Sequence, residues 1–180
     1  MNLQNILHQE VTFEEVSMSQ LKFYWITGLF TIANVIFPVI LHQFPSGGRM
    51  FLPIYFFTLI AGYRFGWRAG VITALASALA SFALTGMPPI PVLPFVLFKG
   101  VLLGLFAGIV ARYSRLPLLL SLLLIVFLYQ FCGAIFEWFM LHNLTLVLAD
   151  ITTGYMGLLL QIFGGAALIS MIDSTWKKNH

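Results

Sequence analysis

The chain has little charge and almost no cysteine. Asp, Glu, Lys and Arg together make up 8% of its 180 residues, whereas a soluble domain carries roughly 25%. So few charges cannot cover a water-facing surface, and the hydrophobic fraction of 60% agrees with this. The composition therefore predicts an integral membrane protein that contacts the lipid bilayer. The single cysteine, Cys132, excludes a disulfide within one chain.

Catalytic and nucleotide-binding patterns are also lacking. The sequence has no spaced His, Glu or Asp set of the kind that binds a catalytic metal, no serine in a nucleophile-elbow context and no glycine-rich phosphate loop. The net charge of +3 comes mostly from short loops and does not indicate a nucleic-acid partner. We therefore expect no enzyme activity, no metal and no cofactor. Uphill transport by this chain would need an ion gradient or a separate ATPase.

Apolar segments occupy most of the chain. At about 20 apolar residues per membrane helix, we expect an all-α membrane protein with six transmembrane helices, at about 23–42, 51–64, 67–85, 92–112, 116–141 and 151–172. Residues 1–22 would form a cytoplasmic or interfacial segment without the apolar core of a cleavable signal peptide. Residues 23–172 would form the membrane domain, and residues 173–180 a cytoplasmic tail.

The basic residues predict the orientation, because Lys and Arg favour cytoplasmic loops. With a cytoplasmic N-terminus, Arg49 is the basic residue of the outer loops and Lys99 lies inside a helix. The remaining basic residues then fall on the inner side, namely Lys22, Arg64, Arg68, Arg112, Arg115, Lys177 and Lys178. Both termini are therefore expected in the cytoplasm.

Two charged residues interrupt the apolar segments. In this topology Lys99 and Glu137 lie at similar depth, in the outer third of the membrane. A charge at the bilayer centre costs roughly 2.5–3.5 kcal/mol on insertion scales. One interpretation is a structural ion pair, or a lysine that reaches the headgroups. The other is a wall of a substrate pocket that opens outward.

Polar and aromatic residues are predicted at the same level. They are candidates to bind a planar organic ligand by stacking and edge hydrogen bonds, although Tyr and Trp also form interfacial belts. The candidate substrate-binding residues are Lys99, Glu137, Trp138, Tyr55, Asn34, His42 and Tyr155, with Gln130 and Gln161 deeper in the membrane.

Small residues recur at helical spacing. Gly100, Gly104 and Gly108 are four apart, as are Ala74 and Ala78. Such spacing lets helices approach closely in lipid. It serves packing within the chain, or the alanine face docks a partner membrane protein.

Residues 47–113 resemble the substrate-binding S components of energy-coupling factor (ECF) transporters. The shared pattern includes Pro53, "AGYRFGWRAG" at residues 61–70, a small-residue third helix, "TGMPP" at 85–89 and the glycine-spaced fourth helix. The resemblance implies capture of a small vitamin or vitamin precursor, here expected to be heterocyclic, at the outer face of a prokaryotic cytoplasmic membrane. It implies as partners a membrane-embedded T component and two cytoplasmic ATPase subunits.

The resemblance also implies which regions form the site. The pocket would include the stretches around Lys99 and around Glu137 and Trp138, with Gly86, Met87, Pro88 and Pro89 as a lid. Docking in this family uses the first helix, which here contains Gly28. A lysine at position 99 favours an anionic or carbonyl-rich ligand unless Glu137 neutralises it. The alternative function is a self-sufficient secondary transporter or channel in which Lys99 and Glu137 relay an ion.

Overall fold

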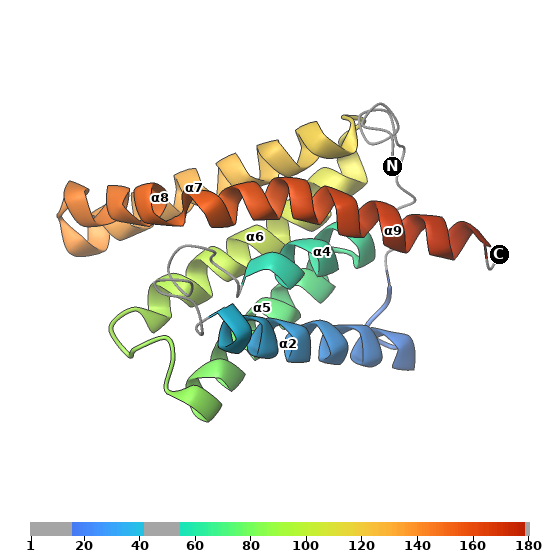
Figure 1. The fold of residues 1–180 in the computed structure, drawn as a ribbon, viewed down its shortest axis with the longest axis horizontal. Helices are drawn as coiled ribbons and strands as arrows, with labels where there is room; N and C mark the ends of the chain where they lie inside the picture. Colours follow the sequence, from blue (N-terminus) through green and yellow to red (C-terminus); the bar gives the residue numbers. More distant parts are fainter. Residues whose placement is uncertain (1–15, 42–54, 179–180) are drawn as a thin grey trace.

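The computed structural model describes residues 16–41 and 55–178, and these residues form helices and short connections (Figure 1). The helices are α2 (Leu21–Leu41), α4 (Phe56–Phe65), α5 (Trp67–Thr85), α6 (Leu93–Tyr113), α7 (Leu118–Leu141), α8 (Leu144–Leu159), the π-helical η2 (Leu160–Gly164) and α9 (Gly165–Lys178). No strand occurs in this described part of the chain. The candidate residue His42 and the motif residue Pro53 lie outside it.

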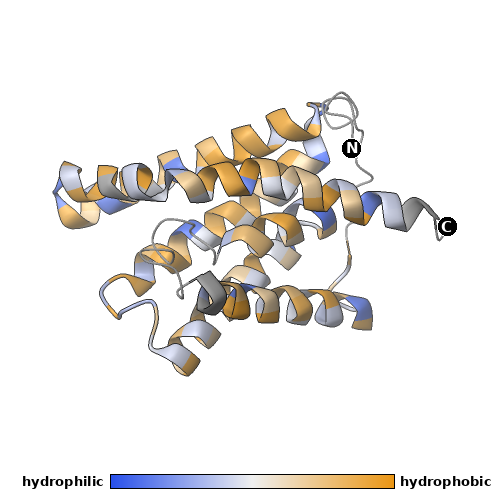
Figure 2. Ribbon diagram, viewed as in Figure 1, coloured by the Kyte–Doolittle hydropathy of each residue, from blue (hydrophilic) through white to orange (hydrophobic). Residues whose placement is uncertain are grey.

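Within the described residues, five helical stretches are long and apolar enough to cross a membrane. They are Leu21–Pro38, Trp67–Thr85, Leu93–Tyr113, Leu118–Leu141 and Leu144–Thr175. Figure 2 shows hydrophobic residues along the whole length of these helices. The fold is therefore that of an all-helical, multi-pass membrane protein. The predicted segment 51–64 is represented by α4, whose 10 residues cover about 15 Å, half of a bilayer core.

The start of α2 and the end of α9 lie at the same end of the bundle, on the right in Figure 1. The α5–α6 connection and the α7–α8 turn lie at the opposite end. The start of α2 and the end of α9 are therefore at one end of the bundle and these two connections at the other. Arg64, however, is not a loop residue as the sequence suggested, because it lies in α4 and is fully buried.

The last helix begins earlier than predicted. The predicted helices at 116–141 and 151–172 leave residues 142–150 as a connection, but only His142 and Asn143 separate α7 from α8. The Asn143 side chain accepts hydrogen bonds from the backbone N–H groups of Thr145 (3.0 Å) and Leu146 (3.3 Å). This cap satisfies donors of the first turn and starts the helix at Leu144. Helical structure then continues through Lys178.

Glycines allow α4, α5 and α6 to pack backbone to backbone. A Cβ atom added at Gly70 would lie 2.7 Å from the Gly62 Cα and 2.8 Å from the Gly104 Cα. One added at Gly108 would lie 2.1 Å from the Trp67 nitrogen. Real Cβ atoms do not approach so closely, so these positions accept only glycine without a shift. The predicted packing role of Gly104 and Gly108 is confirmed.

Gly66 joins α4 to α5 with a single residue. Its φ of 100° and ψ of 160° lie in a region that is essentially restricted to glycine. Gly66→Ala is therefore expected to destabilise the protein by about 1–3 kcal/mol, measured as a lower unfolding midpoint in mixed micelles. Gly86→Asn is the matched control, because Gly86 has a left-handed conformation (φ 69°, ψ 7°) that asparagine tolerates. Equal losses for the two variants would contradict this account of Gly66.

Candidate functional site

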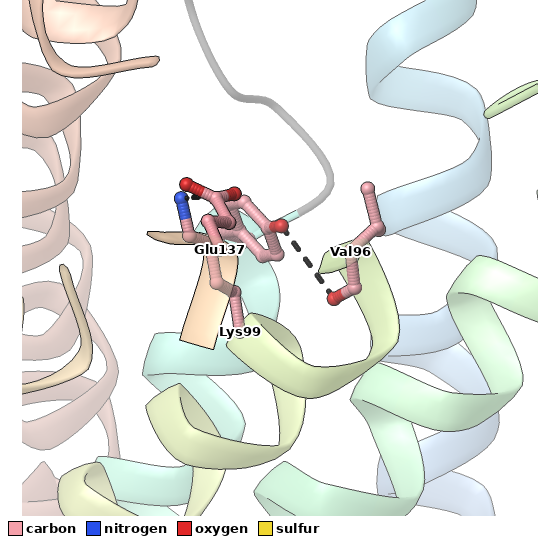
Figure 3. Close-up of polar contacts among 4 residues, drawn as sticks. Val96, Lys99 and Glu137 are labelled. Atoms are coloured by element: carbon pink, nitrogen blue, oxygen red, sulfur yellow. Dashed lines mark hydrogen bonds and ion pairs between the residues drawn. The ribbon is translucent and has the colours of Figure 1, made fainter. Parts of the chain in front are cut away.

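Lys99 and Glu137 form an ion pair between α6 and α7. The Lys99 Nζ lies 2.8 Å from the Glu137 Oε1 (Figure 3). The residues are only 3% and 8% exposed, so Lys99 does not extend to the surface. The predicted similar depth of the two charges is confirmed. Their pairing is the arrangement that lowers the cost of charges in a bilayer.

Gly133 provides the space for the lysine stem. A Cβ at this position would lie 2.6 Å from the Lys99 Cε and 2.7 Å from the Cγ. The aliphatic part of Lys99 therefore crosses α7 at Gly133, one helical turn before Glu137. The sequence analysis missed Gly133, although a glycine four residues before a membrane-embedded glutamate is a visible signal.

Two tyrosines connect the region of the ion pair to the last helix. The Tyr55 hydroxyl donates to the Val96 carbonyl at 3.5 Å, at the long limit of a hydrogen bond (Figure 3). The Tyr55 and Tyr129 ring centroids are 5.9 Å apart. The Tyr129 hydroxyl donates to the Gln161 Oε1 at 3.0 Å. Tyr129, fully buried, was also missed, because an aromatic residue in an apolar run has no distinguishing sequence signal.

Gln161 lies in the π-helical segment η2. Such segments insert an extra residue into an α-helix and occur frequently at functional sites. The Gln161 residue is fully buried, and its Nε2 has no hydrogen-bond partner in the part of the chain that the structure describes. The π-helical segment therefore presents a buried amide donor that none of the described residues uses.

Gln130 has the same property on α7. The residue is 7% exposed, and neither its Nε2 nor its Oε1 has a partner among the described residues. It precedes Glu137 by seven residues, or two turns, so both lie on the same face of α7. An unsatisfied buried polar group costs about 1–3 kcal/mol and calls for an explanation, such as a ligand or water.

The remaining predicted residues lie elsewhere. Asn34 forms a separate network, donating to the Thr58 and Ser77 hydroxyls (3.0 and 3.1 Å) and accepting from the Phe57 N–H (3.1 Å). These bonds tie α2 to α4 and α5. Trp138 and Tyr155 are 48% and 46% exposed, as expected of an interfacial belt.

The predicted lid and docking residues are placed as follows. Gly86, Met87 and Pro89 are exposed, and Pro88 is partly buried, in the connection before α6. Ala74 and Ala78 are buried, and Ala74 lies opposite Gly100, which favours packing over partner docking. Gly28 is partly buried on α2.

An apolar groove runs between α2 and α4. It is lined by Leu29, Ile32, Ala33, Ile36, Phe37 and Phe57. No polar group lines it, so nothing there would orient a polar ligand. The candidate site is therefore centred on the Lys99–Glu137 ion pair between α6 and α7, with Gln130 two turns earlier on α7. Gln161 on η2 is joined to α7 through Tyr129.

Comparison of the chain with protein-family models, curated proteins and solved structures gives no match.

Proposed function

We propose that the protein is a six-span, membrane-embedded substrate-capture subunit of the ECF S-component type. It takes up a small vitamin or vitamin precursor at the outer face of a prokaryotic cytoplasmic membrane, with both termini in the cytoplasm. A T component and two ATPase subunits then drive its release inward. The protein itself catalyses no reaction and holds no metal or cofactor.

The observation that carries the proposal is the buried Lys99–Glu137 ion pair between α6 and α7. Two oppositely charged side chains are buried there, and Gln130, two turns earlier on the same face of α7, has no hydrogen-bond partner among the described residues. Ionisable side chains inside membrane segments are rare and often mark substrate or ion sites. The resemblance of residues 47–113 to S components supplies the class of transport.

Lys99→Ala is expected to weaken capture of the substrate at least about tenfold, equivalent to 1.4 kcal/mol, because the polar wall of the site is lost. The purified protein is reconstituted in nanodiscs and examined by native mass spectrometry for a bound small molecule. The affinity of the identified molecule is then compared between the wild type and Lys99→Ala. Arg115→Ala, which removes an exposed charge, is the control and should bind normally.

Folding is checked separately, because Lys99→Ala leaves Glu137 without this lysine. The double variant Lys99→Met/Glu137→Gln removes both charges and should remain folded, yet bind weakly. Wild-type affinity in the folded double variant would remove the ion pair from the site. Proton flux driven by the substrate in liposomes without ATPases would instead favour the ion-relay alternative.

A further inference from the structure

Exposed arginines gather at the end of the bundle where α2 begins. The α5–α6 connection and the α7–α8 turn lie at the opposite end (Figure 1), so the start of α5, the end of α6 and the start of α7 lie at this one. Arg68 in the first turn of α5, Arg112 in the last turn of α6 and Arg115 just before α7 are exposed. Glu137 and Asp173, the acidic residues whose side chains the structure describes, are buried. Among the described side chains, the exposed charge at this end is therefore positive.

Two of these arginines lie over aromatic rings. The guanidinium carbon of Arg68 is 5.3 Å from the ring centroid of Trp67, and that of Arg112 is 5.5 Å from the ring centroid of Tyr113. Both rings are exposed, at 36% and 74%. A Cβ added at Gly108 would overlap the backbone of Trp67, so the two pairs belong to adjoining turns of α5 and α6. We call this surface the basic–aromatic face, and its members are Trp67, Arg68, Arg112, Tyr113 and Arg115.

The basic–aromatic face lies at the depth of lipid headgroups. The helix α6 has 21 residues and is therefore about 32 Å long, close to the roughly 30 Å thickness of the hydrocarbon core. A helix of this length that crosses the core brings its last turn to the headgroup region. Trp and Tyr are enriched at this level, and basic residues close to it attract anionic lipids. An acidic protein could use the same charges, but the depth and the exposed rings favour a lipid.

We propose that the basic–aromatic face binds the phosphate groups of anionic phospholipids in the leaflet at this end of the bundle. The guanidinium groups of Arg68 and Arg115 donate hydrogen bonds to the phosphate oxygens, an arrangement that arginine favours. The rings of Trp67 and Tyr113 pack among the glycerol groups and the first carbons of the acyl chains. The bound lipids hold the ends of α5 and α6 at a fixed depth. This interaction is separate from substrate capture and does not depend on it.

The test compares an anionic with a zwitterionic lipid. The purified full-length protein is placed in detergent micelles that contain phosphatidylglycerol or phosphatidylcholine at equal mole fraction, and the thermal unfolding midpoint is measured. Phosphatidylglycerol is expected to raise the midpoint by several degrees relative to phosphatidylcholine, since a lipid that binds the native state stabilises it. Added salt should reduce the difference, because it screens exposed charges. Equal midpoints in the two lipids would overturn the proposal.

Variants at two arginines locate the effect. Arg68→Gln/Arg115→Gln removes two exposed charges and is expected to lose at least half of the increase. Arg68→Lys/Arg115→Lys keeps both charges and should keep most of it, and an equal loss in the two variants would contradict recognition by charge. The control is His142→Asn, which changes an exposed residue of the α7–α8 turn at the opposite end and should keep the full increase. An undiminished increase in the glutamine variant would overturn the lipid site and leave an acidic protein as the partner of this face.

Discussion

Lys99→Met is expected to lower the free energy of unfolding by about 3–5 kcal/mol, because it removes one partner of a buried ion pair. The remaining Glu137 carboxylate is 8% exposed and loses its 2.8 Å contact with the ammonium. Methionine approximates the length of the lysine stem, so the packing against Gly133 is largely kept. Glu137→Gln is expected to be destabilising for the converse reason. The unfolding midpoint in mixed detergent micelles measures both effects.

The double variant Lys99→Met/Glu137→Gln distinguishes charge from packing. Replacing a whole buried pair with neutral groups is often neutral or even stabilising, so the double variant should regain most of the loss. In a double-mutant cycle the two single losses would then sum to much more than the loss of the double variant. Additive losses would mean that the two side chains act independently and that the contact contributes no coupling.

The helices could be predicted from the sequence because apolar segments and turn residues determine them locally. The predicted segment 67–85 matches α5 in full. Gly66 precedes this helix and Gly86 follows it, each with a positive φ that glycine adopts readily. The error at the last helix has a local cause too. Asn143 was interpreted as part of a polar loop, whereas its side chain caps the helix that follows.

The site was predicted less completely, because its geometry depends on contacts between distant segments. The equal depth of Lys99 and Glu137 followed from counting residues from the helix ends. The crossing of the lysine over Gly133 and the bond from Tyr129 to Gln161 depend on helix rotation and on the π-helical insertion. Asn34 shows that residue type and depth are not enough to predict a binding residue. Both suggested that Asn34 contacts the substrate, whereas its side chain makes three hydrogen bonds within the bundle.

Gly108→Ala is expected to cost at least about 3 kcal/mol, the upper range for overpacking, and to reduce the yield of folded protein. The added methyl group would lie 2.1 Å from the Trp67 nitrogen, 2.4 Å from its Cα and 2.6 Å from its Cβ. Two of these are backbone atoms that cannot rotate away, so α5 and α6 must separate. Because α4 and α5 pack on the same glycine face of α6, the separation should also loosen the contact around Gly104.

Gly28→Ala is the matched control for this substitution. An added Cβ at Gly28 would meet no atom within 4 Å, and alanine favours a helix over glycine by up to about 1 kcal/mol. This variant should therefore be as stable as the wild type or more so, with the same elution on size exclusion. The opposite ranking, with Gly108→Ala stable and Gly28→Ala unstable, would show that α6 does not approach α5 as closely as the structure places it. It would also favour Gly28 as a contact surface for a partner helix.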